Sequence, residues 1–211
     1  QVIKIFCTKP GVATRPPMVV ITTMTGKSLI DEMTLALVMP RNDHTSRRGN
    51  GVEDAFVMME RPHCLVVGVG AGTGLACVRR FVAGGYKVSM IARHEERLLS
   101  FANSTPHTMA YPSDLAEPDD YRATLRRIVC EQGLPKKVVY NAALATFQPY
   151  SELDIDLFER NFRVNTTGLL VTAQELAPQM VTAGDSALII TGNTGASRGI
   201  PRFVGFSPTK A

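Results

Sequence analysis

From residue 62 onward, short apolar runs alternate with longer amphipathic stretches. The apolar runs cover residues 64–69, 87–92, 108–111, 137–140 and 187–191. Helical periodicity marks the stretches between them, at residues 72–83, 95–102, 118–132 and roughly 155–180. Strand and helix units that follow one another in this way build a parallel sheet with helices on both faces. The sequence therefore predicts an α/β protein with a doubly wound parallel sheet.

Residues 1–57 do not follow this pattern. Four prolines interrupt the segment, and a polar stretch at residues 41–54 has the composition of a linker. We expect two parts, an N-terminal extension at residues 1–57 whose role is unassigned and a domain at residues 58–211. Three explanations are open for this segment: a short extension, a poorly ordered leader, or sequence upstream of a natural start at Met58 or Met59.

Composition excludes several classes of partner. The 23 basic and 19 acidic residues give a net charge of +4 without a basic run, which argues against nucleic acid. Charged residues interrupt the apolar stretch at 18–39, so no membrane span is expected. The four cysteines and four histidines show no metal-ligand spacing. We predict no metal, a cytoplasmic location with reduced thiols, and core positions for Cys64 and Cys77.

A glycine-rich turn joins the first apolar run to the helix that follows. Its glycines, with Thr73 at the start of the helix, are Gly68, Gly70, Gly72 and Gly74. Glycines at such a junction let the backbone approach a pyrophosphate and direct the N–H groups of the helix start at its charge. This context predicts a Rossmann fold that binds a dinucleotide. The alternative is a turn that merely packs the strand on the helix.

Arg93 follows the second predicted strand. An enzyme that uses NAD usually places an acidic side chain there to bind the ribose 2′-hydroxyl. A guanidinium suits a 2′-phosphate instead, because its fork matches the phosphate oxygens. The cofactor is therefore predicted to be NADP, with NAD as the second choice. A solvated position at the start of a helix is the alternative for Arg93.

With these elements in place, residues 62–211 resemble the short-chain dehydrogenase/reductase family. The resemblance rests on Gly68-x-x-x-Gly72-x-Gly74, on Asp114-Leu115, on Asn141-Ala142-Ala143, on Asn165 and on Lys210. It implies that Asp114 and Leu115 face the adenine. It also implies that Asn141, Ala142 and Ala143 border the cofactor, that Asn165 organises a proton relay and that Lys210 binds the nicotinamide ribose.

Four positions depart from the family pattern. Val67 stands where Thr is usual, and Tyr140 replaces the Asn that usually precedes Asn141. Phe206 occupies the position of the proton-donating Tyr, four residues before Lys210, and Asn193 stands where a catalytic Ser is expected. A benzyl ring cannot donate a proton. The changes at Phe206 and Asn193 resemble an atypical bacterial branch labelled generic oxidoreductases.

Residues near the expected nicotinamide end are the candidates for catalysis. Asn165, Lys210 and Asn193 are predicted to be catalytic, with Thr194 and Ser197 as further polar candidates. Each has a structural alternative: Asn193 and Thr194 as turn caps, Asn165 as a buried structural amide, and Lys210 as a solvated helix residue. The sequence ends one residue after Lys210, whereas family members continue, so we expect a domain truncated at its C-terminal side.

Two functions remain open at this point. The first is an NAD(P)-dependent oxidoreductase with an atypical site, acting on a small carbonyl or alcohol substrate. The second is a non-catalytic NADP-binding sensor or scaffold. We expect a small-molecule substrate and neither nucleic acid nor membrane as partner, and we leave open whether the chain forms a homo-oligomer.

Overall fold

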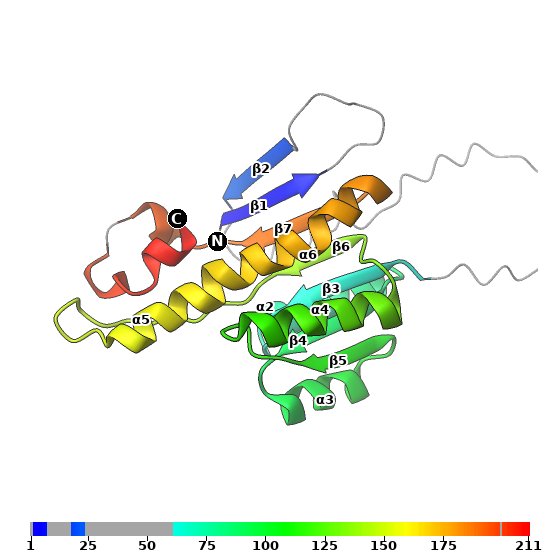
Figure 1. Ribbon diagram of the computed structural model, residues 1–211, viewed down its shortest axis with the longest axis horizontal. Coiled ribbons are helices and arrows are strands. Elements are labelled where there is room, and N and C mark those ends of the chain that lie inside the picture. The colour runs from blue at the N-terminus through cyan, green and yellow to red at the C-terminus, as the bar shows by residue number, and fades with distance from the viewer. Residues whose placement is uncertain (1, 8–17, 24–60, 199) are drawn as a thin grey trace, which may run out of the picture.

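The computed structural model describes residues 2–7, 18–23, 61–198 and 200–211. A seven-stranded sheet runs through the molecule in the order β2-β1-β7-β6-β3-β4-β5 (Figure 1). Five strands are parallel to one another. They are β3 (His63–Val67), β4 (Lys87–Ala92), β5 (Thr108–Pro112), β6 (Lys137–Tyr140) and β7 (Ala187–Thr191). The predicted parallel sheet is confirmed, with strand ends that differ from the prediction by no more than two residues.

Helices connect the parallel strands and cover both faces of the sheet. They are α2 (Thr73–Ala83), α3 (Glu95–Ser104), α4 (Pro118–Gln132), α5 (Ile155–Phe162) and α6 (Gly168–Ala183). Successive strand residues face opposite sides, so Cys64 and Val66 pack with α2 and α3 while Leu65 and Val67 pack with α4 and α6. Each face therefore has its own apolar core. Cys64 and Cys77 lie in the first of these cores, as predicted.

The direction of chain progression reverses at β3. The chain moves outward from β3 to β4 and β5, then crosses back to β6 and β7 on the other side of β3. The connections after β3 and β6 therefore leave the sheet in opposite directions. A crevice forms between them at the carboxyl ends of the strands, which is where open parallel sheets bind ligands.

The helix predicted at roughly residues 155–180 is one helical run with a widened turn inside it. Residues Arg163–Thr167 form a π-helical turn between α5 and α6. Tyr140 packs against this turn, where its hydroxyl donates a hydrogen bond to the carbonyl oxygen of Val164. A Cβ on Gly168 would overlap that hydroxyl. The sequence pattern does not show this widened turn, because the side chain against which it packs comes from β6.

Two strands lie within residues 1–57, where the sequence predicted none. They are β1 (Val2–Cys7) and β2 (Met18–Thr23), which form an antiparallel pair. Strand β1 also pairs antiparallel with β7, with Ile3 opposite Thr191. The polar stretch at residues 41–54 and the candidate start at Met58 or Met59 lie outside the described residues.

A buried histidine joins three elements at the other end of the sheet from the crevice. The His63 Nδ1–H group donates to the Gly133 carbonyl at 2.7 Å, and Nε2 accepts from the Ser89 hydroxyl at 2.8 Å. With Nδ1 as the donor, the neutral ring satisfies both partners without burying a charge. Burial lowers the pKa of His63 from 6.5 to about 4.

The His63 ring predicts acid sensitivity of the fold. In the unfolded chain His63 takes up a proton near pH 6.5, whereas in the folded chain it is protonated only near pH 4. Stability from this group is therefore complete above pH 6.5 and falls as the pH drops to 4, by about 3 kcal/mol in total. Urea unfolding of wild type and His63→Gln at pH 7 and pH 4 gives the free energy of unfolding of each protein. We expect the difference between these two free energies to be about 3 kcal/mol smaller at pH 4 than at pH 7. A difference that does not change with pH would contradict this account.

Candidate functional site

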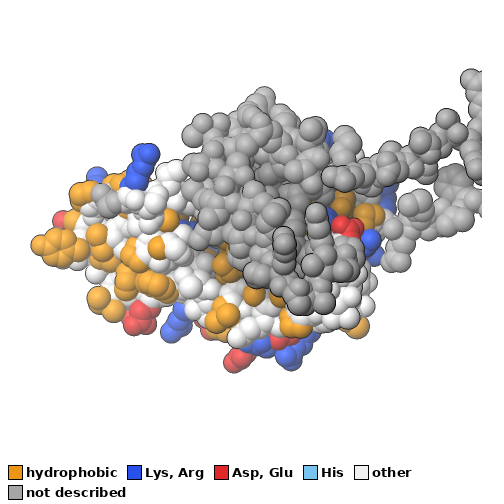
Figure 2. Space-filling view, turned by 90° about the horizontal axis from the view of Figure 1, so that it is seen from above, with side chains coloured by type: hydrophobic (Ala, Val, Ile, Leu, Met, Phe, Trp, Pro, Cys, Tyr) orange, Lys and Arg blue, Asp and Glu red, His pale blue; other side chains and the backbone are white. Residues whose placement is uncertain are grey.

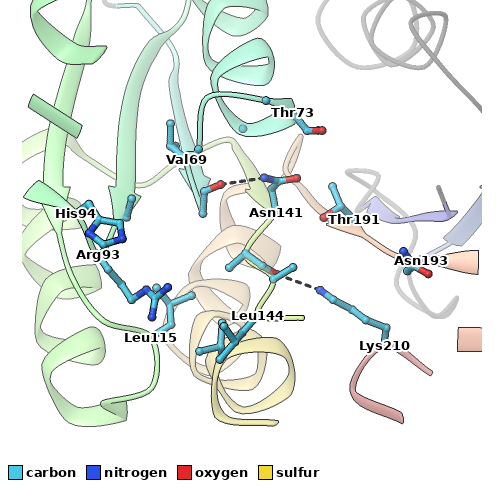
Figure 3. Close-up of a pocket in the computed structure, with 18 of the residues that line it drawn as sticks. Val69, Thr73, Arg93, His94, Leu115, Asn141, Leu144, Thr191, Asn193 and Lys210 are labelled. Atoms are coloured by element: carbon cyan, nitrogen blue, oxygen red, sulfur yellow. Dashed lines mark hydrogen bonds between the residues drawn. The ribbon is translucent and has the colours of Figure 1, made fainter. Parts of the chain in front are cut away.

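A cavity of about 370 Å³ opens at the carboxyl ends of β3, β4 and β6 (Figure 3). All twelve residues that the sequence predicted for cofactor binding line it: Gly68, Gly70, Gly72, Thr73, Gly74, Arg93, Asp114, Leu115, Asn141, Ala142, Ala143 and Lys210. Of the predicted catalytic residues, Lys210 and Asn193 line the cavity and Asn165 does not. The structure thus brings into one cavity residues that lie as far apart in the sequence as Gly68 and Lys210.

The glycine-rich turn forms one wall. Gly68 has a φ of +87°, and the N–H groups of Gly68 and Val69 both donate to the Ile91 carbonyl, which holds the turn against β4. A Cβ on Gly68 would overlap the backbone of Ala142. By contrast, nothing lies within 4 Å of the Cβ positions of Gly70 and Gly72. The turn is therefore closed toward the protein and open toward the cavity, as a pyrophosphate cradle requires.

Asn141 fastens the loop after β6 to this turn. Its backbone N–H donates to the Val67 carbonyl at 2.8 Å, and its side-chain amide donates to the Gly68 carbonyl at 2.9 Å. Gly74 fits beside them, because a Cβ there would lie 2.6 Å from the Gly68 oxygen. The two sides of the crevice are thereby fixed relative to one another.

Arg93 lies at one end of the cavity together with two basic residues that the sequence analysis did not single out. His94 and Arg97 line the same region, and the side chains of Arg93 and His94 lie close together in Figure 3. Arg93 and His94 immediately precede α3 and Arg97 lies in its first turn, so the start of this helix brings the three together. The signal available in the sequence was three basic residues close together after the second predicted strand. The corner is suited to bind an anionic group.

Asp114 lines the cavity with both carboxylate oxygens engaged. Oδ1 accepts a hydrogen bond from the backbone N–H of Ala116 at 3.0 Å, which closes the turn after β5. Oδ2 forms an ion pair with Arg160 of α5. The contact with adenine that the resemblance implies stays a prediction. The structure adds Arg160, on a helix beyond the predicted motif, as the partner that orients this carboxylate.

Lys210 lies at the opposite end of the cavity from Arg93. It ends the short 3₁₀ turn Ser207–Lys210, and its ammonium donates to the carbonyl oxygen of Ala142 at 3.0 Å. Burial lowers its pKa from 10.5 to about 8. The alternative of a solvated helix lysine does not hold, because this side chain is turned inward and bonded.

Phe206 is buried, with 5% of its surface exposed, and belongs to a cluster of three aromatic rings. Its ring centroid lies 6.1 Å from that of Phe147 and 6.3 Å from that of Phe203. Figure 2 shows apolar side chains gathered at the end of the molecule that the loop after β6 and the C-terminal turns form. Phe147 and Tyr150 are exposed there. This end of the cavity offers an apolar wall where the family pattern has a phenol.

The two asparagines predicted to be catalytic have structural partners. The Asn193 side chain accepts a hydrogen bond from the Gly195 N–H at 2.7 Å and caps the 3₁₀ turn Thr194–Ser197, as the capping alternative described. Thr194 and Ser197 are not among the residues that line the cavity. Asn165 is 2% exposed and bonds to Leu144 and Thr209. Its contacts are those of a buried structural amide.

In the part of the chain that the structure describes, no group of three His, Cys, Asp or Glu side chains is arranged to hold a metal ion. Among the same residues, no helix is long and apolar enough to span a bilayer.

A doubly wound parallel sheet, with a glycine-rich turn and a cavity at the point where strand order reverses, defines a Rossmann-type dinucleotide-binding fold. Residues 62–211 match the family model described as short chain dehydrogenase. The chain belongs to this family, whose members bind NAD(P)(H).

Relatives and solved structures agree with this assignment. L-xylulose reductase of Mesocricetus auratus is 30% identical over 134 residues, which cover 64% of this chain and 53% of the relative. D-erythrulose reductase of Gallus gallus is 31% identical over 134 residues, with the same coverage. A short-chain dehydrogenase/reductase structure from Serratia marcescens has a TM-score of 0.64 at 26% identity, over 71% of this chain and 62% of that one. The chain spans a little over half the length of these curated relatives.

The overlap of Gly68 with Ala142 predicts a steric effect that can be separated from backbone strain. Gly85 also has a φ of +87° but has nothing within 4 Å of its Cβ position. Gly85→Ala should therefore cost only the strain of a left-handed alanine, about 1–2 kcal/mol. Gly68→Ala should cost about 2–3 kcal/mol more, because the loop after β6 must move.

Urea unfolding of the two variants and the wild type measures both costs. Equal losses of stability in Gly68→Ala and Gly85→Ala would mean that the approach of Gly68 to Ala142 is not a tight constraint.

Proposed function

We propose that the chain is the cofactor-binding part of an NAD(P)-dependent oxidoreductase that interconverts a small carbonyl compound and its alcohol. NADP is the preferred cofactor, and Lys210 supplies the proton that a phenol supplies elsewhere in the family. The observation that carries the proposal is the single cavity running from the basic corner at Arg93, past the glycine-rich turn, to the buried Lys210 ammonium. The names of the similar reductases support a carbonyl substrate.

The residues present fit a dinucleotide. Gly70 and Gly72 leave open space where a pyrophosphate would lie, and α2 begins at Thr73 with its N-terminal N–H groups at the same place. Arg93, His94 and Arg97 would meet a 2′-phosphate on the adenosine ribose. Lys210 would lie at the nicotinamide end. The bound cofactor would supply or accept a hydride.

The protein's own contribution is position and a proton. In the direction of reduction the carbonyl carbon gains a hydride, and the oxygen gains a proton from the Lys210 ammonium. The amine that remains recovers its proton from water. Burial lowers the pKa of Lys210 to about 8, so the group is protonated at neutral pH and releases its proton more readily than an exposed lysine.

We include in this proposal that the chain belongs to the atypical branch with Phe at this position. Phe206 is buried and packs against other aromatic rings, which supports a phenylalanine that is part of the fold rather than a chance loss of the tyrosine. The cytoplasmic location remains a prediction from the sequence, and whether the chain forms a homo-oligomer stays open.

Arg93 predicts which cofactor binds more tightly. Titration with NADPH and NADH, followed by cofactor fluorescence, should give tighter binding of NADPH to the wild type. Arg93→Asp should weaken NADPH binding about ten- to hundredfold, because a charge-assisted bond to phosphate is lost and an acid takes its place. NADH binding should change little.

The matched control is Arg79→Asp, which makes the same change of charge at an exposed position of α2 outside the cavity. It should leave both affinities as they are. A wild type that binds neither cofactor would contradict the proposed function, and equal effects of the two variants would contradict the assignment of the 2′-phosphate to Arg93.

Lys210 predicts the pH dependence of carbonyl reduction. Because the ammonium form donates the proton, the rate should be constant below about pH 8 and fall as the pH rises through that value. Lys210→Arg keeps the positive charge but does not titrate in this range, so its residual rate should lack the fall near pH 8. Steady-state rates with NADPH and a panel of small ketones, between pH 6 and pH 10, measure this.

The variant Phe206→Tyr separates the enzyme from the non-catalytic alternative, which the buried benzyl ring at Phe206 favours. If the wild type is inactive and Phe206→Tyr reduces a carbonyl, the natural protein is a binder and the proposed activity is wrong. If the wild type is active and Phe206→Tyr leaves the rate unchanged or lowers it, the native site uses another acid, as proposed.

A further inference from the structure

Two buried asparagines lie four residues apart on the helical run that follows the loop after β6. Asn161, the second-last residue of α5, is fully buried, and Asn165 lies in the π-helical turn with 2% of its surface exposed. Both amides point at the same two segments. One is the loop at residues 141–154 and the other is the C-terminal segment at residues 205–210.

Asn161 joins these segments directly. Its side-chain N–H donates to the Gly205 carbonyl at 2.8 Å and to the Thr146 hydroxyl at 2.9 Å. The segments that it bridges lie 15 and 44 residues away in the sequence. A Cβ on Gly205 would come within 3.3 Å of the Asn161 amide and within 3.1 Å of the Leu153 side chain. A glycine at 205 therefore allows the carbonyl to reach Asn161.

Asn165 repeats the arrangement one turn later. Its amide exchanges two hydrogen bonds with the backbone of Leu144, both at 2.8 Å, and donates to the Thr209 hydroxyl at 2.8 Å. Thr209 in turn donates to the Phe206 carbonyl at 2.7 Å, and Thr166 donates to the carbonyl of Thr209 at 3.2 Å. The segment that ends in Lys210 is thus tied to the helix at Gly205 and again at Thr209.

Burying two amides is costly unless every group is paired, and an apolar side chain would fill the same space without that requirement. What an apolar side chain cannot do is fix the relative position of two segments. The Lys210 ammonium also bonds to the carbonyl of Ala142, inside the cavity. This bond joins the loop at residues 141–154 to the segment at residues 205–210, the two segments that the asparagines hold together.

We propose that Asn161 is a positioning residue of this site. It holds the segment at residues 205–210 against the loop that carries Ala142, and thereby fixes where the Lys210 ammonium lies in the cavity. Asn161 itself does not line the cavity and touches no reacting group. Its importance for catalysis rests on the proposed function, whereas its effect on Lys210 does not.

The experiment measures the titration of Lys210 in the chain without cofactor. Brief labelling with acetic anhydride at pH 6 to 11, followed by mass spectrometry of the peptide that contains Lys210, gives the midpoint at which the amine becomes reactive. The wild-type midpoint is expected near pH 8. Asn161→Leu keeps the branched shape of the side chain and removes the amide. Its midpoint should rise by about one unit or more, because a loosened Lys210 regains water.

The matched control is Tyr121→Phe. It removes another buried hydrogen bond, to Thr172 of α6, on the side chain of a residue that does not line the cavity. The variant should lose stability and keep the wild-type midpoint. A structural role for Asn161 without positioning would give the same result in Asn161→Leu, namely lower stability with an unchanged midpoint, and would overturn the proposal.

A second variant covers the case in which Asn161→Leu does not fold. Thr146→Val is nearly isosteric and removes one of the two partners of Asn161 while leaving its bond to Gly205. It should shift the Lys210 midpoint in the same direction by a smaller amount, and no shift would count against the proposal. Because no cofactor is present, these outcomes do not depend on whether the chain binds one.

Discussion

The close approach of two backbones at the reversal point of the sheet is the constraint on which the site depends. The turn after β3 and the loop after β6 meet at Gly68 and Ala142, where there is no room for a side chain on the glycine. Asn141 fixes the contact with two hydrogen bonds. Because the two connections then diverge, the space beyond the contact cannot be filled by either of them. The cavity follows from this geometry, and the glycine-rich turn, the start of α2 and the loop that carries Ala142 all take their positions from it.

The parts that the sequence predicted well are those encoded by local pattern. Strands such as Lys87–Ala92 and helices such as Pro118–Gln132 have the bounds that apolar periodicity indicated. Cofactor residues could be named in advance because they follow strand ends, and the carboxyl ends of parallel strands meet at one edge. The catalytic roles of Asn165 and Asn193 stay predictions, and each side chain makes the hydrogen bonds of its structural alternative.

The parts that were missed depend on contacts between distant segments. The π-helical turn is shaped around the Tyr140 hydroxyl, which comes from another element. Arg160 matters through its ion pair with Asp114, 46 residues earlier. Asn161 has partners on two loops, and in the sequence its only signal is an asparagine one turn before Asn165 on an otherwise apolar helix face. Such residues carry no local signature, because the requirement that they meet arises only once the sheet has formed.

Strand β1 has a consequence for how the chain reaches its native state. Its partner β7 lies almost a full chain length away, with Ile3 opposite Thr191, and the N- and C-termini lie near each other in Figure 1. Contacts of such long sequence separation form late, because a large loop must close before they stabilise anything. Strand β1 can pair with β2 as soon as both are made, but this pair can join the rest of the sheet only after β7 has formed. The glycine-rich turn and its helix would therefore be in place before the antiparallel pair docks beside β7.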